Sequence, residues 1–167
     1  MDRIDHLLDK YESDLKKADK GVCRKVNRCS EFRNGFQQDY LYKYKPILEK
    51  IAEKLIDKSH AVRIEEKASE DDFYGFRLSV VPRHLHRYPE DRYYPDSLWS
   101  SVDFFANEHT LTVDVETVVR PAVENLENRF LETIPGDRFN EEKLIKTVSQ
   151  FLEDVFVQTI ILHFRSP

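Results

Sequence analysis

The spacing of apolar residues changes near residue 59 and again near residue 120, and these changes constrain the fold more than any other feature of the chain. Before residue 59, apolar residues recur every three or four positions, which is typical of amphipathic helices. Between residues 60 and 119 they alternate with polar residues, which indicates strands with one buried face. The helical spacing then returns. This order predicts an α+β domain whose helices pack on one face of an antiparallel sheet.

Three helices are expected in the first 59 residues. The first is amphipathic and is weakened near its end by Gly21, the second begins near Ser30, and the third begins at Pro46 because proline costs no hydrogen bond in a first helical turn. Their apolar faces consist of Ile4, Leu8, Tyr11, Leu15, Ala18 and Val22, then Phe32, Phe36, Tyr40 and Tyr44, and then Ile47, Leu48, Ile51, Ala52, Leu55 and Ile56.

Four strands are expected between residues 60 and 119, and they are predicted to form a four-stranded antiparallel β-meander. The segments "AVRIEE" and "GFRLSVVP" flank an acidic turn and should pair as a hairpin. The segments "LWSSVDFFA" and "TLTVDVETVV" flank the short turn "NEH" and should form a second hairpin.

The C-terminal part is expected to be helical again. Pro121 should begin a helix over "PAVENLENRFLETI", and Asn140 should cap another. Residues 155–164 are rich in β-branched and aromatic residues, so a terminal strand stays open, although we favour helix. The prediction is a single domain, 1–167, with a helical part (1–59), a sheet (60–119) that carries a long loop (83–97), and C-terminal helices (120–165).

Composition excludes some locations and classes of protein. Of the 167 residues 40% are hydrophobic and the net charge is −5, which suits a globular core but not a strongly basic nucleic-acid binder. No apolar run reaches the about 18 to 20 residues of a membrane span, and the N-terminus lacks an apolar leader, so a cytoplasmic location is expected. Cys23 and Cys29 would lie about 9 Å apart along a helix and should stay reduced.

The segment "RHLHRYPEDRYYP" is the strongest candidate contact surface in the sequence. Long connections within a compact domain are often functional, and arginine and tyrosine are enriched where protein interfaces carry binding energy. The expected contact residues of this loop, 83–95, are Arg83, Arg87, Tyr88, Arg92, Tyr93 and Tyr94.

Nucleic-acid binding is the first alternative. Lys17, Lys20, Arg24 and Arg28 would share one side of a helix and could contact phosphates. The arginines of the loop could do the same, while its tyrosines stack on bases.

A metal-dependent hydrolase with a dispersed site is the second alternative. His84 and His86 would project to one side of an extended chain, but zinc requires three or four ligands, so they are weak candidates and no metal or cofactor is expected. Asp103, Asp114 and Glu116 could meet on the outer sheet face, where a charged, solvated surface is the simpler interpretation.

Local motifs for a nucleophile, a phosphate loop or a nucleotide cofactor are missing from the sequence, so an enzyme is disfavoured but undecided. We therefore predict a non-enzymatic, intracellular protein-interaction module, an adaptor or regulator, that binds a protein partner. Its contact surface would be the 83–95 loop, the N-terminal amphipathic helix, or both. Homodimer formation through that helix stays open.

Overall fold

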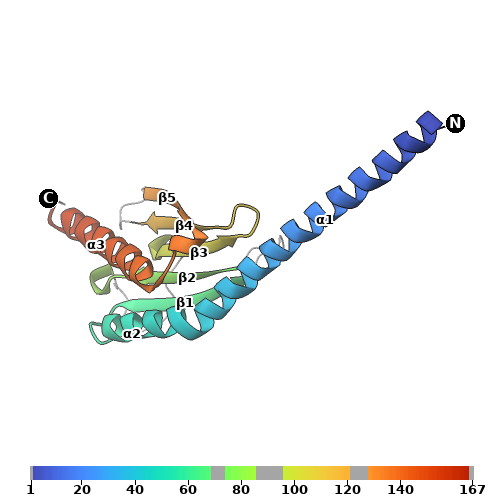
Figure 1. The fold of residues 1–167 in the computed structure, drawn as a ribbon. Coiled ribbons are helices and arrows are strands. Elements are labelled where there is room, and N and C mark those ends of the chain that lie inside the picture. Colours follow the sequence, from blue (N-terminus) through green and yellow to red (C-terminus); the bar gives the residue numbers. More distant parts are fainter. Residues whose placement is uncertain (1, 69–73, 86–95, 121–127, 166–167) are drawn as a thin grey trace.

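The structure is a computed structural model that describes residues 2–68, 74–85, 96–120 and 128–165. It has the α+β architecture expected from the sequence, with one sheet and long helices at both ends of the chain (Figure 1). The helices are α1 (Asp2–Asp39), α2 (Lys45–Ile56) and α3 (Glu141–Arg165). The strands are β1 (Ala61–Ala68), β2 (Tyr74–Val81), β3 (Ser100–Asn107), β4 (Thr112–Val119) and β5 (Asn128–Pro135).

The sheet is an antiparallel meander in which the strands lie side by side in chain order, β1-β2-β3-β4-β5. Both hairpins predicted from the alternating segments are confirmed. In the first, Ile64 lies opposite Leu78, and in the second, Phe104 lies opposite Val115. These residues belong to the core or pack against it, because side chains alternate between the two faces of a strand.

The fifth strand corrects the prediction of four strands followed by a helix at Pro121. Residues 121–127 lie outside the described part, but residues 128–135 form β5 and pair with β4. The four-residue spacing of Phe130 and Ile134 suggested a helix, yet along the strand only Ile134 is buried, while Phe130 is 56% exposed. Pairing with β5 satisfies backbone N–H and C=O groups of β4 that would otherwise be unpaired at the sheet edge. The stabilisation from this pairing outweighs the weak helical spacing of the apolar residues.

The prediction of three separate helices in the first 59 residues is also wrong, because α1 continues through Gly21 and Ser30 and then runs on into α2. A single π-helical segment, Tyr40–Tyr44, joins α1 to α2, and the N–H of Lys45 donates to the carbonyl of Tyr40. Pro46 has no N–H to donate, so one helical hydrogen bond is missing there. The wider π turn just before it lets the helix continue without that bond. A π turn also holds more residues than an α turn. The aromatic residues spaced by four therefore stay directed at the sheet.

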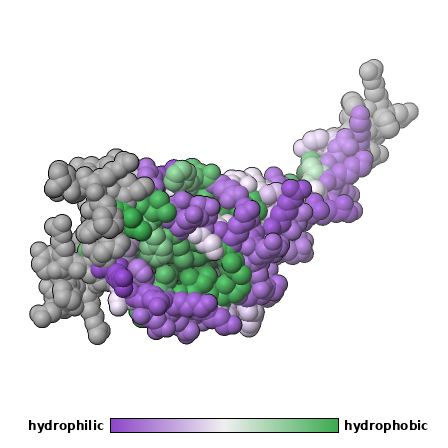
Figure 2. Space-filling view, turned by 90° about the vertical axis from the view of Figure 1, so that its left-hand side faces the viewer, coloured by the Kyte–Doolittle hydropathy of each residue, from purple (hydrophilic) through white to green (hydrophobic). Residues whose placement is uncertain are grey.

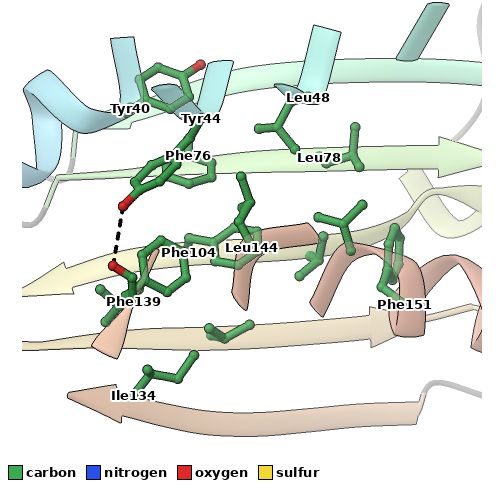
Figure 3. Close-up of a cluster of buried hydrophobic side chains, with 14 of the residues drawn as sticks. Tyr40, Tyr44, Leu48, Phe76, Leu78, Phe104, Ile134, Phe139, Leu144 and Phe151 are labelled. Atoms are coloured by element: carbon green, nitrogen blue, oxygen red, sulfur yellow. Dashed lines mark hydrogen bonds between the residues drawn. The ribbon is translucent and has the colours of Figure 1, made fainter. Parts of the chain in front are cut away.

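The core lies between the sheet and the helical layer and is rich in stacked aromatic rings (Figure 3). The ring of Phe76 stacks on Tyr40 from the helical layer, at 4.6 Å between centroids, and on Phe104 from β3, at 4.9 Å. Phe36 stacks on Phe76 at 5.7 Å. The aromatic face predicted for residues 32–44 is thus the part of the helical layer that fixes α1 to the sheet.

Helix α3 covers the other half of the same sheet face. The backbone N–H of Lys143 donates to Oδ1 of Asn140 at 2.9 Å, so the predicted cap is confirmed. The helix continues to Arg165, so helix is also confirmed for residues 155–164. Leu144, Val148, Phe151 and Val155 are its buried residues in the core.

Among the residues that the structure describes, several apolar side chains at the edge of the core are only partly buried. Figure 2 views the end of the domain opposite the free part of α1, where apolar residues gather between hydrophilic ones. Partly buried apolar side chains pack against the core from both helical parts and from the outermost strand, namely Phe32, Ile47, Ile51, Val62, Ile64, Leu152 and Phe156.

We predict that the protein loses stability between about pH 10 and pH 12. Burial raises the pKa of Tyr44 from 10.0 to about 12, with smaller contributions from the carboxylates of Asp39 and Glu141. Burial also raises the pKa of Tyr40, with the Glu66 and Glu49 carboxylates adding to the effect. The unfolded chain therefore releases these protons first, so the stabilisation is present below pH 10 and is lost as pH rises toward 12.

Urea denaturation at a series of pH values measures this loss as a falling midpoint. Tyr44→Phe should flatten part of the decline, although it also removes the 3.5 Å bond from the Tyr44 hydroxyl to the Phe139 carbonyl. Tyr42→Phe is the matched control, because Tyr42 is 79% exposed. A decline of the same slope in Tyr44→Phe and the unaltered chain would contradict the assignment.

Candidate functional site

Helix α1 extends from the domain into solvent over much of its length (Figure 1). Residues 10–28 are all exposed, a segment about 28 Å long at 1.5 Å per residue. Its large apolar side chains are the exposed Tyr11 (65%), Leu15 (41%), Val22 (61%) and Val26 (56%). With Ala18 they form a line on one side of the helix, which we call the apolar stripe.

Acidic residues border the first half of the apolar stripe. At 3.6 residues per turn, Glu12 and Asp19 fall on one side of the stripe and Asp14 falls on the other. The lysines of the same segment lie on the remaining surface of the helix, and they are Lys10, Lys16, Lys17 and Lys20. The stripe therefore presents apolar side chains between carboxylates, while the opposite side of α1 is basic.

The four predicted basic contacts lie on this helix. All four are exposed and share the side of α1 that lies opposite the apolar stripe, and they are Lys17, Lys20, Arg24 and Arg28. Nζ of Lys17 lies 3.6 Å from a carboxylate oxygen of Asp14, an exposed contact of little energetic weight.

The predicted contact loop is described only at its ends. Arg83 begins a short 3-10 turn, and its backbone N–H donates to Nδ1 of His60 at 3.1 Å. Arg87, Tyr88, Arg92, Tyr93 and Tyr94 lie outside the described residues, and so does His86. Arg83 follows the end of β2 away from Tyr74, whereas Phe36 of α1 packs against Tyr74. The structure therefore does not bring Arg83 together with the basic residues of α1.

The outer face of the sheet holds the carboxylates considered for cation binding or acid–base chemistry. Asp103 lies directly opposite Glu116, as expected, but Asp103 is completely buried rather than solvated. Its Oδ1 accepts a hydrogen bond from Nε of Arg77 at 2.5 Å and lies 3.3 Å from Nζ of Lys67. The expectation of a solvated face is wrong here, because these two long side chains shield the carboxylate as well as neutralise it.

The other two carboxylates of this face are also engaged. Glu116 pairs with Arg129 of β5 at 2.6 Å. Asp114 accepts hydrogen bonds from the amide of Asn107 and the hydroxyl of Thr133, each at 3.0 Å. These contacts tie β3, β4 and β5 together across the sheet, so the carboxylates serve a structural role.

Metal-binding geometry is not found in the described part of the chain, where no group of three or more His, Cys, Asp or Glu side chains could hold one ion. Cys23 and Cys29 are both free thiols, as predicted. Nδ1 of His60 accepts a backbone hydrogen bond, and its ring packs against Phe156 in a tilted arrangement with 5.0 Å between centroids. This histidine therefore has a packing role.

A shallow groove of about 290 Å³ lies between β4, β5 and α3. The exposed side chains of Phe130 and Leu131 line it. Lys143 of α3 crosses to Glu132 of β5 at 2.7 Å. Its lining contains no cysteine, serine or histidine among the residues that the structure describes, so we assign it no reaction.

Comparisons with protein families, curated proteins and solved structures found no match to this chain. None of the described helices is both long enough and apolar enough to span a membrane. The function must therefore be argued from the surface of the molecule.

The sequence predicted the apolar spacing of the N-terminal helix but missed two features. The first is the extension of the stripe to Val26, which breaks the heptad spacing. The second is the acidic border formed by Glu12, Asp14 and Asp19, which occupies the positions next to the heptad seam. Heptad lettering of residues 11–22 would have found this border, because charged residues at these positions select helical partners.

Proposed function

We propose that the protein is an interaction module that binds an α-helix of a partner protein along the apolar stripe of α1. The observation that supports it is the exposure of the stripe on a helix that extends beyond the sheet and the other helices. A helix in water usually requires packing of its apolar face, and the large apolar side chains of this face are 41–65% exposed. A helix with apolar residues at matching heptad positions would supply it.

The acidic border favours a basic partner helix over a second copy of this chain. In a parallel pair of identical helices, Asp14 would lie close to Asp19 of the second copy. In an antiparallel pair, Glu12 would approach Asp19 of the second copy. Both arrangements place like charges together, whereas lysine or arginine beside the partner's apolar residues would pair with these carboxylates.

The test uses two synthetic helical peptides of three heptads with the same apolar seam, one with lysine and one with glutamate at the flanking positions. We expect the lysine peptide to bind the full chain at least about tenfold more tightly than the glutamate peptide, since three exposed charge pairs contribute about 0.3–0.5 kcal/mol each with lysine and like charges cost similar amounts with glutamate. Fluorescence anisotropy of labelled peptide measures both affinities. The difference should shrink in 0.5 M salt because exposed charges are screened.

Leu15→Asp combined with Val22→Asp should abolish binding of the lysine peptide. The matched control, Ser13→Asp combined with Asn27→Asp, adds the same charge on the opposite side of α1 and should keep binding. Equal affinity for the two peptides, or none, would overturn the proposal. Sedimentation that detects a dimer of the unaltered chain, lost in Leu15→Asp with Val22→Asp, would assign the stripe to a second copy instead.

The expected role of the 83–95 loop stays a prediction. Replacing Arg92, Tyr93 and Tyr94 by alanine tests whether this loop contacts a partner, without changing the apolar stripe.

A further inference from the structure

A pocket of about 320 Å³ lies between α1 and the turn that joins β3 to β4. From α1 it is lined by Gly21, Arg24, Lys25, Arg28 and Cys29, and from the turn by His109 and Leu111. It lies on a different side of α1 from the middle of the apolar stripe. Three cations and an imidazole thus line one small concavity, with no carboxylate among its described lining residues.

The turn that closes this pocket is fixed against α1 by close backbone packing. The N–H of Gly136 donates to the carbonyl of Leu111 at 2.9 Å, while Leu111 itself has a positive φ of 57°. A Cβ atom at position 136 would collide with the ring of Phe32 from α1. Within the turn, Oδ1 of Asn107 accepts the Thr110 N–H at 3.4 Å. These contacts hold His109 and Leu111 at a set position beside the helix.

The cations of the pocket lack an internal counter-charge. Within the described part of the chain, Arg24, Lys25 and Arg28 form no ion pair at 4.0 Å or less. Arg24 and Arg28 are also one helical turn apart, where like charges destabilise a helix. An anion between them would remove this repulsion and accept hydrogen bonds from two planar guanidinium groups.

We infer that this pocket binds a phosphate group, with Arg24, Lys25 and Arg28 as its charged contacts. Guanidinium groups match the tetrahedral phosphate by paired hydrogen bonds, and lysine adds a point charge. The volume is near the lower limit for small-molecule sites, about 300 Å³, which suits a small phosphorylated compound. Because the turn closes one side, the pocket fits a terminal phosphate better than the continuous backbone of a nucleic acid.

Titration of the ¹⁵N-labelled full chain with inorganic phosphate, with pyrophosphate and with a nucleoside monophosphate, at constant ionic strength, tests the inference. We expect saturable amide shifts confined to residues 21–29 and 107–111, with sodium chloride producing none. Arg24→Gln and Arg28→Gln should each weaken binding at least tenfold. Tighter binding of the monophosphate than of free phosphate would identify an organic phosphate as the ligand, and the reverse order would identify the inorganic ion.

Two kinds of control distinguish a built pocket from general attraction to a basic helix. Lys17→Gln and Lys20→Gln remove the same charge from α1 outside the pocket and should change affinity less than twofold. Gly21→Leu fills the pocket without changing charge and should weaken binding at least tenfold; the space around a Cβ at Gly21 is open, so folding should be kept.

Equal weakening by all four charge variants, or shifts that do not saturate, would overturn the inference. So would tight binding of a single-stranded oligonucleotide that depends equally on Lys17, Lys20, Arg24 and Arg28, because it would identify a nucleic-acid track instead. None of these outcomes depends on the partner helix of the apolar stripe.

Discussion

Phe76→Ala should lower the free energy of unfolding by about 3–5 kcal/mol, the range for loss of a buried phenylalanine. Phe76 is completely buried in the centre of the aromatic cluster, between Tyr40 and Phe104 (Figure 3). The loss has two parts, the transfer of the ring and the cavity that it leaves. Stacked rings on both sides have little freedom to collapse into that cavity, so we expect a value in the upper half of the range.

Urea denaturation followed by circular dichroism measures this loss. A domain of this kind is stabilised by about 5–15 kcal/mol in total, so the loss should be a large fraction of the stability of the protein. The control is Leu131→Ala, a truncation on the same sheet at a side chain that is 78% exposed, and it should cost about 0.5 kcal/mol or less. Comparable losses in the two variants would contradict the packing described for the core.

Asp103→Asn should lower the free energy of unfolding by about 2–3 kcal/mol. The substitution keeps the size of the side chain but removes the charge that pairs with Arg77 and Lys67. Breaking a fully buried ion pair costs about 3–5 kcal/mol, because the remaining charge is left without compensation. The side chains of Arg77 and Lys67 are 30% and 32% exposed, so water reaches these cations in part and moderates the cost.

The matched control for Asp103→Asn is Glu116→Gln on the neighbouring strand. Glu116 pairs with Arg129, whose side chain is 54% exposed, so this variant should cost less than about 1 kcal/mol. A double-mutant cycle of Asp103→Asn with Arg77→Gln should give a coupling energy of about 0.5–3 kcal/mol. A coupling near zero, or equal losses at Asp103 and Glu116, would show that the carboxylate is not held by this pair.

Both proposed binding sites lie on α1, but on different sides of it. The apolar stripe runs from Tyr11 to Val26, and the phosphate pocket is lined by residues 21–29 on the side of the helix that faces the β3–β4 turn. The aromatic residues from Phe36 onward then hold the same helix to the core. Both sites thus lie on one uninterrupted helix, which continues to the π-helical segment next to the sheet.

The sequence alone was sufficient to predict the helices and strands in which apolar periodicity and capping or turn residues indicate the same structure. The β1–β2 and β3–β4 hairpins, the Asn140 cap and the apolar face of α3 all follow from alternation, helical spacing and capping chemistry, which act over a few residues. The apolar and basic positions of α1 were likewise visible, because they depend only on 3.6-residue spacing, but the exposure of the apolar ones was not.

Only the tertiary structure decided the features that depend on distant partners. Residues 128–135 become a strand because β4 offers unpaired backbone N–H and C=O groups, and Asp103 is buried because Arg77 of β2 and Lys67 of β1 reach it. The phosphate pocket likewise joins residue 24 to residue 109. Local spacing sets which side of a helix or strand is apolar, but backbone pairing, charge burial and pocket formation depend on residues that only the folded chain brings together.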